Sequence, residues 1–492
     1  MPLSFTEWSP DDRPGEVHSI ESEADLVDLA RRYSADGNNR ALNRILDIAR
    51  QHGVKSVVIE NRYIDSDWRS QHAEFYGSTF TRYPSVCHRL HFFTAVIPSN
   101  LQDLGQFQDN YRGYSVMRPL PNAPVGRTMI CPPPQMDGAV TAQATETIHL
   151  FGWAFTITAM PFISQDSQYL RCAHASLWMV LRHAEFVHGL PRQLPKQIHE
   201  ACSGGVVEGR QIPSAGLTQH QLLDGSTRLG LSMARMPVPA RNDTPDITDV
   251  TLYNVTCRYI SSQLPPIVLS PNHAWVVVAW QRVPSRGNSR ITLWRHDDSA
   301  GPYLRVDDPY DRPDDGHVWT SILMPLMNKM YIAAERAELA GYAWLNSLID
   351  TYGSATSTAV EARDAGGLTV QTYAVRSTDF KARIAHRDLP SDLAALYRLS
   401  HMPRYIWVVE AVDRRAREAG EPDVLGEVLI DSTQSEGLRP ESTEPILAAH
   451  VGSMVLTNGT DHRSTRTHEF EGDSKYRSDL YTQLSATTKD KP

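Results

Sequence analysis

Two residues suited to nucleophilic catalysis, a cysteine and a histidine, stand about a hundred positions apart in this chain. Cys172 stands where a helix is predicted to begin, and His273 opens a strongly apolar segment. The N-terminus of a helix stabilises negative charge, which favours the thiolate, the nucleophilic form of cysteine. A neighbouring imidazole can hold that thiolate as an ion pair and later protonate a leaving group. The pair therefore predicts covalent acyl-transfer chemistry, provided that the fold brings the two side chains together.

A third group must orient the imidazole, and two adjacent aspartates have a suitable spacing. If the chain turns within residues 284–288, antiparallel pairing places residues 297–300 opposite His273. Asp297 and Asp298 occupy that stretch. Either of them could orient the ring.

The oxyanion formed during acyl transfer needs hydrogen-bond donors close to the nucleophile. Gln165 stands seven residues before Cys172, and its amide could join the cysteine's own backbone N–H in that role. Gln168 is a competing amide in the same segment, and Asp308 is a rival to the two aspartates as the acid. The sequence thus defines the nucleophile and the histidine better than the acid and the oxyanion donor.

The elements that must position these residues have clear signatures. Between residues 172 and 188, apolar side chains recur at steps of three and four, and other apolar residues fill the opposite side. A helix that is apolar nearly all round is a core helix, and Gly189 and Pro191 are expected to end it. Three strands are predicted downstream, the last two as a hairpin, over residues 265–271, 272–283 and 289–297.

The rest of the chain predicts a protein of the α+β class. Residues 22–34 and 39–52 have the periodicity of helices, and short strands punctuated by proline and glycine fill residues 87–163. A strand and a helix are expected over 322–346, and a strand pair around 420–422. We divide the chain into an N-terminal helical and α/β region (1–85), a β-rich segment (86–160), a core with the candidate residues (161–320), a C-terminal α/β region (321–457) and a disordered tail (458–492).

Composition narrows the function classes. The 492 residues are 41% hydrophobic with a net charge of −9, so a large core is available and no overall basic field would attract nucleic acid. Five scattered cysteines without a CxxC pair exclude a disulfide framework and a thiolate zinc cage, and favour a reducing, cytoplasmic location. The first residues lack the pattern of a secretory signal, and the longest apolar run, 149–163, is shorter than the ~20 residues of a membrane helix. We expect no membrane insertion, no cofactor and no metal.

The other cysteines and a nearby histidine are expected to be structural. Cys202 is predicted to lie at the end of a helix, and Cys87, Cys131 and Cys257 to lie in strands. His174 stands two positions beyond the candidate nucleophile on the same helix and so faces away from it, which predicts a surface or packing role.

The order of the candidate residues resembles the papain-like cysteine peptidase superfamily. Within it, the chain is most similar to the bacterial bacteriocin-processing (double-glycine leader) peptidases and their relatives. The likeness covers roughly residues 161–310. It rests on Gln165, on Cys172 followed by small residues, on the stretch 216–231, on His273 leading an apolar strand, and on the acidic turn 297–301.

This resemblance implies a papain-like core, in which a buried nucleophile helix packs on an antiparallel sheet. It also implies a cysteine peptidase or isopeptidase with a protein or peptide substrate. Cys172 would form a thioester with the substrate, and His273 would act as general base and acid. Asp297 or Asp298 would orient the histidine, and Gln165 would help to form the oxyanion hole.

Two other functions stay open. Papain-like folds also support transglutaminase, deamidase and acyltransferase reactions, because a fold does not determine the reaction. A catalytically inactive scaffold or binding protein is the other alternative, since Ala173 and Ser299 stand where the family usually has glycine and proline. The sequence carries no signal for the oligomeric state.

Overall fold

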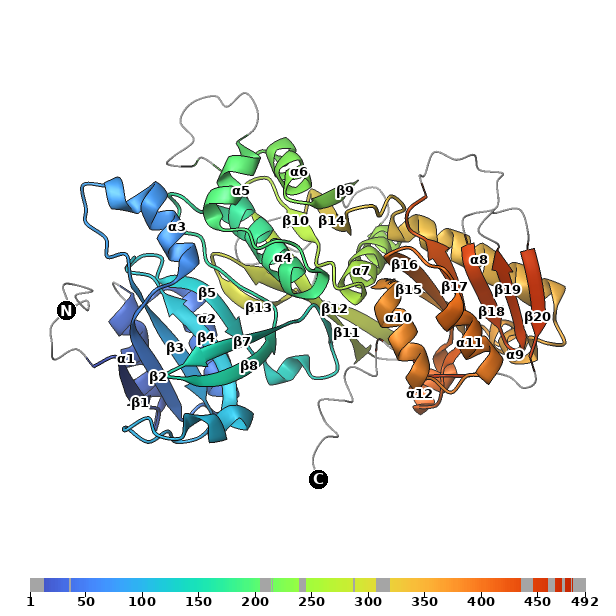
Figure 1. The fold of residues 1–492 in the computed structure, drawn as a ribbon, viewed down its shortest axis with the longest axis horizontal. Coiled ribbons are helices and arrows are strands. Elements are labelled where there is room, and N and C mark those ends of the chain that lie inside the picture. Colours follow the sequence, from blue (N-terminus) through green and yellow to red (C-terminus); the bar gives the residue numbers. More distant parts are fainter. Residues whose placement is uncertain are drawn as a thin grey trace. The chain divides into compact units, whose positions relative to one another are not determined.

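The computed structural model of the chain describes residues 13–34, 37–203, 214, 216–238, 245–285, 288–306, 319–434, 446–458, 465–470, 474–478 and 480. The chain forms two compact units (Figure 1). The first unit comprises Met1–Asp249 and Leu264–Pro325, and the second unit comprises Val250–Gln263 and Leu326–Pro492. Both units combine helices with antiparallel sheets, which confirms the α+β class.

The first unit opens with a five-stranded antiparallel sheet in the order β1-β2-β3-β4-β5. Its strands are β1 (Gly15–Ser19), β2 (Ser56–Tyr63), β3 (Cys87–Phe93), β4 (Tyr111–Met117) and β5 (Val125–Ile130). The accompanying helices are α1 (Glu23–Tyr33), α2 (Arg40–Gln51) and α3 (Ser66–Glu74). The helices predicted over 22–34 and 39–52 are therefore confirmed, since α1 and α2 differ from them by one residue at each end. Asn39 and Asp65 cap α2 and α3 by accepting backbone N–H bonds.

A separate hairpin, β7 (Ala144–Leu150) and β8 (Trp153–Ala159), contains most of the longest apolar run. Buried and exposed residues alternate along both strands, the pattern of a sheet with one face on the core. On the buried face, the ring of Phe155 lies 5.4 Å from that of Phe93 and 4.9 Å from that of Tyr111. The hairpin therefore packs its apolar face on the five-stranded sheet.

The second sheet of the first unit carries the candidate residues. Its order is β13-β12-β11-β10-β14-β9, and β6 also pairs with β11. β11 and β12 form the predicted hairpin, with Ser285 paired to Asn288, and residues 274–280 of β11 are all buried. The strands are β6 (Val140–Thr141), β9 (Leu231–Pro237), β10 (Ile267–Leu269), β11 (Ala274–Ser285), β12 (Asn288–Asp297), β13 (Gly301–Val306) and β14 (Ser321–Met327).

Three helices belong with this sheet: α4 (Cys172–His188), α5 (Pro195–Cys202) and α6 (Gln219–Arg228). α4 has the bounds that its apolar periodicity predicts, and it ends at Gly189, whose φ of 71° favours glycine. It packs against β11 (Figure 1). The indole N–H of Trp178 donates to Oδ1 of Asp67 at 3.0 Å, which joins α4 to α3.

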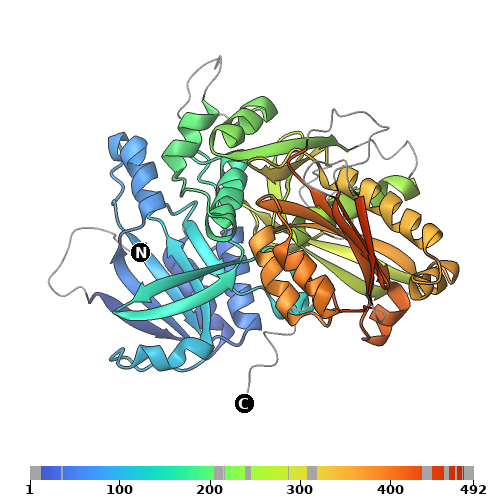
Figure 2. The same ribbon diagram turned by 45° about the vertical axis from the view of Figure 1, so that its right-hand side comes forward.

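The second unit is built on a six-stranded antiparallel sheet in the order β15-β16-β17-β18-β19-β20. Helix α8 covers one face, and α10 and α11 cover the other (Figure 2). Alternate residues of β16 point to opposite faces: Val409 lies so close to Gly341 of α8 that a Cβ there would be 2.5 Å from it, whereas Val408 shares a core with Tyr397 of α11.

The elements of the second unit have the following bounds. The strands are β15 (Leu368–Arg376), β16 (Tyr405–Asp413), β17 (Val424–Asp431), β18 (Ile446–Val451), β19 (Met454–Asn458) and β20 (Thr465–Glu469). The helices are α8 (Ala334–Thr351), α9 (Ser357–Asp364), α10 (Ser377–Arg383), α11 (Ser391–Leu399) and α12 (Arg414–Ala419). Short 3-10 helices in the two units are Tyr76–Ser78, Leu104–Asn110, Pro134–Met136 and Ile384–His386. The strand and helix expected over 322–346 and the strand pair around 420–422 are confirmed by β14, α8, β16 and β17.

Two regions differ from the expectation. Cys257 lies in helix α7 (Pro245–Ser261) and not in a strand. Its β-branched neighbours favour a strand by composition, but Leu252, Val255 and Tyr259 are buried at steps of three and four, and this helical packing prevails. Strand β20 falls within the range expected to be a disordered tail, where it pairs with β19.

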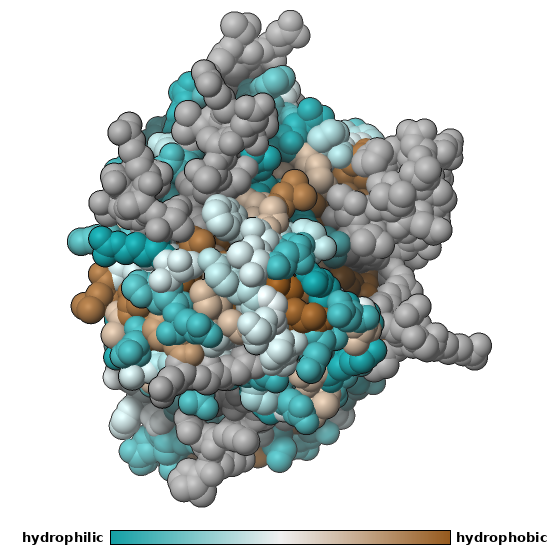
Figure 3. Space-filling view, turned by 90° about the vertical axis from the view of Figure 1, so that its right-hand side faces the viewer, coloured by the Kyte–Doolittle hydropathy of each residue, from teal (hydrophilic) through white to brown (hydrophobic). Residues whose placement is uncertain are grey.

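Among the helices that the structure describes, none combines the length and the apolar composition needed to cross a bilayer. On the face drawn in Figure 3, apolar residues occur in small groups among hydrophilic ones. Leu399, 81% exposed, is an example of an apolar side chain that stands in solvent. Scattered residues of this kind are ordinary on protein surfaces.

A buried ion network connects three parts of the first unit. One carboxylate oxygen of Glu146 on β7 lies 2.9 Å from Arg127 of β5 and 2.9 Å from Arg182 of α4. Tyr114 of β4 donates to the other oxygen at 2.6 Å. Arg127 also lies 3.2 Å from Asp65. All of these groups are buried, so the loss of a partner would leave a buried charge or polar group unpaired, which is strongly destabilising.

We predict that Glu146→Ala destabilises the first unit by about 3–5 kcal/mol, because it leaves two buried guanidinium groups without their shared partner. Urea unfolding followed by tryptophan fluorescence measures the change. The matched control is Arg31→Ala, whose ion pair with Asp28 is mostly exposed, and which should cost less than about 1 kcal/mol. Equal midpoints for the two variants would contradict a stabilising role for the network.

Candidate active site

Helix α4 presents Cys172 at its first turn. The backbone of Arg171 is extended, with φ −95° and ψ 170°, so the helix begins at Cys172. The first N–H groups of an α-helix have no partner within the helix, and they give this end a partial positive charge. Cys172 itself is only partly buried. The position therefore combines a reachable thiol with backbone donors that can bind an anion.

The loop before α4 is held by a carboxylate that sequence reasoning missed. Oδ1 of Asp166 accepts the backbone N–H bonds of Gln168, Tyr169 and Leu170 at 2.9, 2.8 and 2.8 Å. Ser167 within this loop has a φ of 62°, in the left-handed region that non-glycine residues seldom occupy. An aspartate followed by polar residues is the signal for such a turn, but many surface turns carry the same signal.

His273 lies directly before β11. Its backbone carbonyl accepts the N–H and the hydroxyl of Ser270 at 2.9 and 3.1 Å, which closes a turn between β10 and β11. Its ring lies 5.5 Å from the ring of Trp275, measured between centroids. The side chain is 9% exposed. The start of β11 thus places the imidazole where little solvent reaches it.

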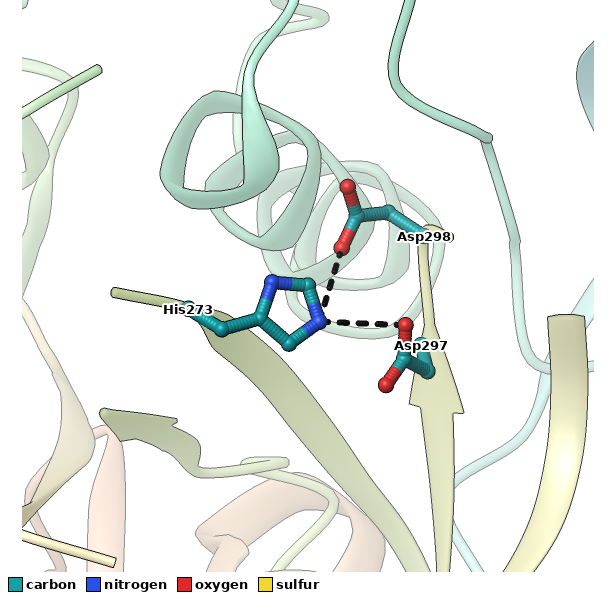
Figure 4. A group of neighbouring side chains, drawn as sticks. All are labelled: His273, Asp297 and Asp298. Carbon is teal, nitrogen blue, oxygen red and sulfur yellow. Dashed lines mark hydrogen bonds and ion pairs between the residues drawn. The ribbon is translucent and has the colours of Figure 1, made fainter. Parts of the chain in front are cut away.

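The imidazole of His273 stands between the thiol and two acids. Its Nε2 lies 3.1 Å from Oδ1 of Asp297 and 3.6 Å from Oδ1 of Asp298 (Figure 4). The other ring nitrogen, Nδ1, points away from both carboxyl groups. A hydrogen bond also joins the imidazole to the side chain of Cys172. The structure therefore brings together four of the five residues in the sequence-based site, from the start of α4, the residue before β11 and the end of β12 with the residue that follows it.

Electrostatics at this cluster favours a charged imidazole. Burial acts to lower the pKa of His273, but hydrogen bonds to Asp297 and Cys172 and the charges of both aspartates outweigh it and raise the pKa to about 11. Burial acts to raise the pKa of Asp297, but the hydrogen bond and charge of His273 outweigh it and lower that pKa. An imidazolium next to a carboxylate is the expected state at neutral pH.

The two aspartates have different surroundings. Asp297 also accepts the backbone N–H groups of Ser299 and Ala300 at 3.0 and 3.2 Å, and Arg295 lies 3.5 Å from its second oxygen. Among the described residues, the carboxyl group of Asp298 accepts a hydrogen bond from its own backbone N–H and from no other residue's backbone. Burial, with the Asp297 charge, raises the pKa of Asp298, so this carboxyl tends to keep its proton. Asp297 is therefore the better placed to orient the imidazole.

The two candidate glutamines lie in different places. The Ser164 hydroxyl and the Gln165 N–H donate to the carbonyl of Asp298 at 2.6 and 3.3 Å, and the Gln165 amide nitrogen donates to Oγ of Ser299 at 2.5 Å. Gln168 instead lines a cavity beside the residues that follow α3. Gln165 is thus attached to the turn that carries the acids. Asp308 lies outside the described residues.

The turn after the acids requires glycine. Gly301 has a φ of 122°, and a Cβ there would lie 2.6 Å from the Cβ of Arg44. The Arg44 guanidinium donates to the carbonyls of Pro302 and Tyr303 at 3.2 and 2.7 Å. Helix α2, distant in sequence, therefore supports the strand next to the acid-bearing turn.

The same histidine and acids could also hold a metal ion. One ligand atom from each of His273, Asp297 and Asp298 lies within 4.8 Å of the others. Imidazole and carboxylate are ligands for zinc and other divalent metals. A metal bound there would take the lone pair of the ring nitrogen that now faces Asp297. Metal binding and proton transfer by His273 are therefore competing uses of one cluster.

Cys87, Cys131 and Cys202 have structural surroundings. Burial raises the pKa of Cys131 to about 11 and that of Cys202 to about 12, and raises that of Cys87 well above its ordinary value. Cys202 ends α5, as predicted. The ring of His174 is buried and stacks on that of His199 at 4.1 Å, so its role is packing and not surface exposure.

Comparisons with known proteins show a weak structural likeness to a solved peptidase domain. No family model matches the sequence, and no curated protein matches it. Among solved structures, the peptidase domain of Streptococcus ComA, a bifunctional ABC transporter involved in a quorum-sensing pathway, aligns with 34% of this chain and 98% of that domain. The identity is 16% and the TM-score is 0.22.

We predict that iodoacetamide at mildly acidic pH labels Cys172 before any of Cys87, Cys131 and Cys202. The physical reason is that burial raises the pKa of those three thiols, whereas Cys172 is hydrogen-bonded to an imidazole that carries positive charge. Peptide mass spectrometry of a labelling time course measures the rates. His273→Ala should remove the preference, and equal slow labelling of all four thiols would contradict it.

A second prediction separates the two acids. Asp297→Asn should lower the pKa of His273, because it removes the ionised partner that stabilises the imidazolium. Asp298→Asn should lower it less, because the raised pKa of Asp298 leaves that carboxyl largely protonated. NMR titration of the imidazole measures both shifts. The opposite ranking would identify Asp298 as the partner.

Proposed function

We propose that the chain is a papain-like cysteine peptidase or isopeptidase that hydrolyses a peptide-type bond through a Cys172 thioester. The observation that carries the proposal is the placement of the His273 imidazole, which hydrogen-bonds the Cys172 side chain and, through Nε2, lies 3.1 Å from Asp297. A thiol, an imidazole and an acid in this order form the constellation of nucleophilic acyl transfer.

In the first half of the proposed reaction, the Cys172 thiolate attacks the carbonyl carbon of the substrate and a C–S bond forms. The N–H groups at the start of α4 bind the oxyanion, together with the amide of Gln165 when it turns from Ser299. The His273 imidazolium gives the proton on Nδ1 to the leaving nitrogen. The C–N bond then breaks, an amine leaves, and a thioester stays on the enzyme.

In the second half, the neutral imidazole takes a proton from water, and the resulting hydroxide attacks the thioester carbonyl. The C–S bond breaks, and the products are a carboxylic acid, the Cys172 thiolate and a His273 imidazolium. Asp297 stabilises that imidazolium in both halves and holds its Nε2, which keeps Nδ1 directed at the sulfur. Every proton moved by His273 is thus recovered within one turnover.

The test is cleavage of a defined peptide mixture, with new termini identified by mass spectrometry. Cys172→Ala and His273→Ala should each lower turnover by at least about a thousandfold, because the nucleophile and its base act as one unit. Cys131→Ala is the matched control and should keep turnover. Cleavage that persists in Cys172→Ala would sink the proposal.

Two additions to this assay separate the alternatives. Hydrolysis in ¹⁸O-labelled water places one label in the new carboxylate, whereas ammonia release or an amine adduct without cleavage indicates a deamidase or transglutaminase. A chelator should leave turnover in place. Loss of activity with the chelator and its return with zinc would favour a metal at His273, Asp297 and Asp298 instead.

A further inference from the structure

Two further side chains lie on the sheet face that carries the imidazole and its acid. Trp275 follows His273 by two residues, and Arg295 precedes Asp297 by two residues. Residues two apart on a strand lie on the same face of a sheet. Arg295 of β12 is paired with Val277 of β11, which places these two residues on one face as well. The register of the hairpin therefore gathers His273, Trp275, Arg295 and Asp297 on one side of the sheet.

These four side chains form a closed group, which we call the square. Oδ1 of Asp297 lies 3.1 Å from Nε2 of His273 (Figure 4), and a terminal nitrogen of Arg295 lies 3.5 Å from Oδ2 of Asp297. The guanidinium carbon of Arg295 lies 4.9 Å from the centre of the Trp275 ring. That ring lies 5.5 Å from the ring of His273. Each member of the square thus has two of the others as neighbours.

Burial makes these contacts stronger than they would be at the surface. Trp275 is fully buried and Arg295 is only 6% exposed. A buried guanidinium is costly unless an acid and further contacts compensate for the water that it has lost. The carboxylate of Asp297 supplies the acid, and the face of the Trp275 ring supplies a cation–π contact. Arg295 is therefore held from two sides.

The orientation of the Asp297 carboxylate depends on contacts at both of its oxygens. The last torsion of an aspartate side chain has a broad preference, so the side chain alone does not fix which way the oxygens face. Oδ1 accepts the backbone N–H groups of Ser299 and Ala300 and lies against His273. Arg295 lies on the side of Oδ2. Partners on both oxygens hold the plane of the carboxylate, and Oδ1 stays directed at the imidazole.

Arginine suits this place better than lysine does. Its planar guanidinium can stack on an indole and pair with a carboxylate at the same time, whereas the ammonium of lysine is a compact charge on a flexible stem. The partner of Arg295 is the acid that also contacts the imidazole. An effect on Arg295 would therefore pass through Asp297 to His273.

We propose that Arg295 is a positioning residue of the candidate active site. Supported by Trp275, it holds Oδ2 of Asp297, so that Oδ1 keeps the imidazole of His273 aligned with the Cys172 side chain. Arg295 exchanges no proton and touches no reacting atom. The effect on turnover rests on the proposed function, whereas the alignment of the imidazole rests on the contacts of the square alone.

The test in turnover is a double-mutant cycle on a cleaved peptide. Arg295→Met keeps a side chain of similar length without the charge, and it should lower kcat about ten- to a hundredfold, because the reacting groups lose their alignment. KM should change less than about twofold, since no substrate contact is removed. Arg295→Lys should restore part of kcat. In the Asp297→Asn background, Arg295→Met should cost nothing further, and losses that add in both backgrounds would overturn the proposal.

A matched control has the same buried chemistry without an imidazole. Arg387 of the second unit lies 3.0 Å from Glu427 and 4.4 Å from the centre of the Tyr476 ring. Arg387→Met should lower the free energy of unfolding but leave kcat per folded molecule unchanged. Trp275→Phe, which keeps an aromatic face, should lower kcat less than Trp275→Leu does. Equal kcat in the two Trp275 variants would contradict a supporting role for the ring.

An NMR measurement separates this inference from the proposed function. In the full chain labelled with ¹⁵N-histidine, the proton on Nε2 of His273 is assigned by its loss in His273→Ala. This proton should exchange with water at least about fivefold faster in Arg295→Met than in the unchanged chain or in Arg387→Met, because its bond to Asp297 opens more often. Absence of the signal from the unchanged chain, or an equal exchange rate in Arg295→Met, overturns the positioning role. Peptide cleavage that needs Cys172 would in that case leave the proposed function intact, and faster exchange supports the positioning role even where no peptide is cleaved.

Discussion

The geometry of the candidate site depends on one buried contact, that between Nε2 of His273 and Oδ1 of Asp297. His273 directly precedes β11 and Asp297 ends β12, so the contact exists only in one pairing register of this hairpin. A slip by one residue would turn every side chain of a strand to the opposite face. The apolar run of β11, buried on both faces, makes such a slip costly because charged and polar residues would replace it in the core. Burial of the apolar residues of β11 therefore fixes the strand register that aligns His273 with Asp297.

Segments far away in sequence support this alignment. Arg44 of α2 binds the backbone of β13, Asp67 of α3 accepts from Trp178 of α4, and Glu146 of β7 pairs with Arg182 of α4. Each contact involves a partner that precedes residue 161. Helices α2 and α3 and the hairpin β7–β8 thus help to hold α4 and β13 in place. A truncation that keeps only residues 161–320 would remove these partners and leave buried charges without counterions.

The parts of this arrangement that sequence predicts are those set by local periodicity. The bounds of α4 and the pairing of β11 with β12 follow from apolar spacing and a turn, which neighbouring residues determine. The choice between Asp297 and Asp298 does not, because it depends on which carboxyl group accepts the N–H groups of Ser299 and Ala300 in the folded chain. Helix α7 shows the same limit, because its β-branched residues favour a strand by composition, whereas packing in the folded chain makes the segment a helix. The cavity beside Asp166 was invisible for a further reason, since its walls come from three segments that meet only in the folded chain.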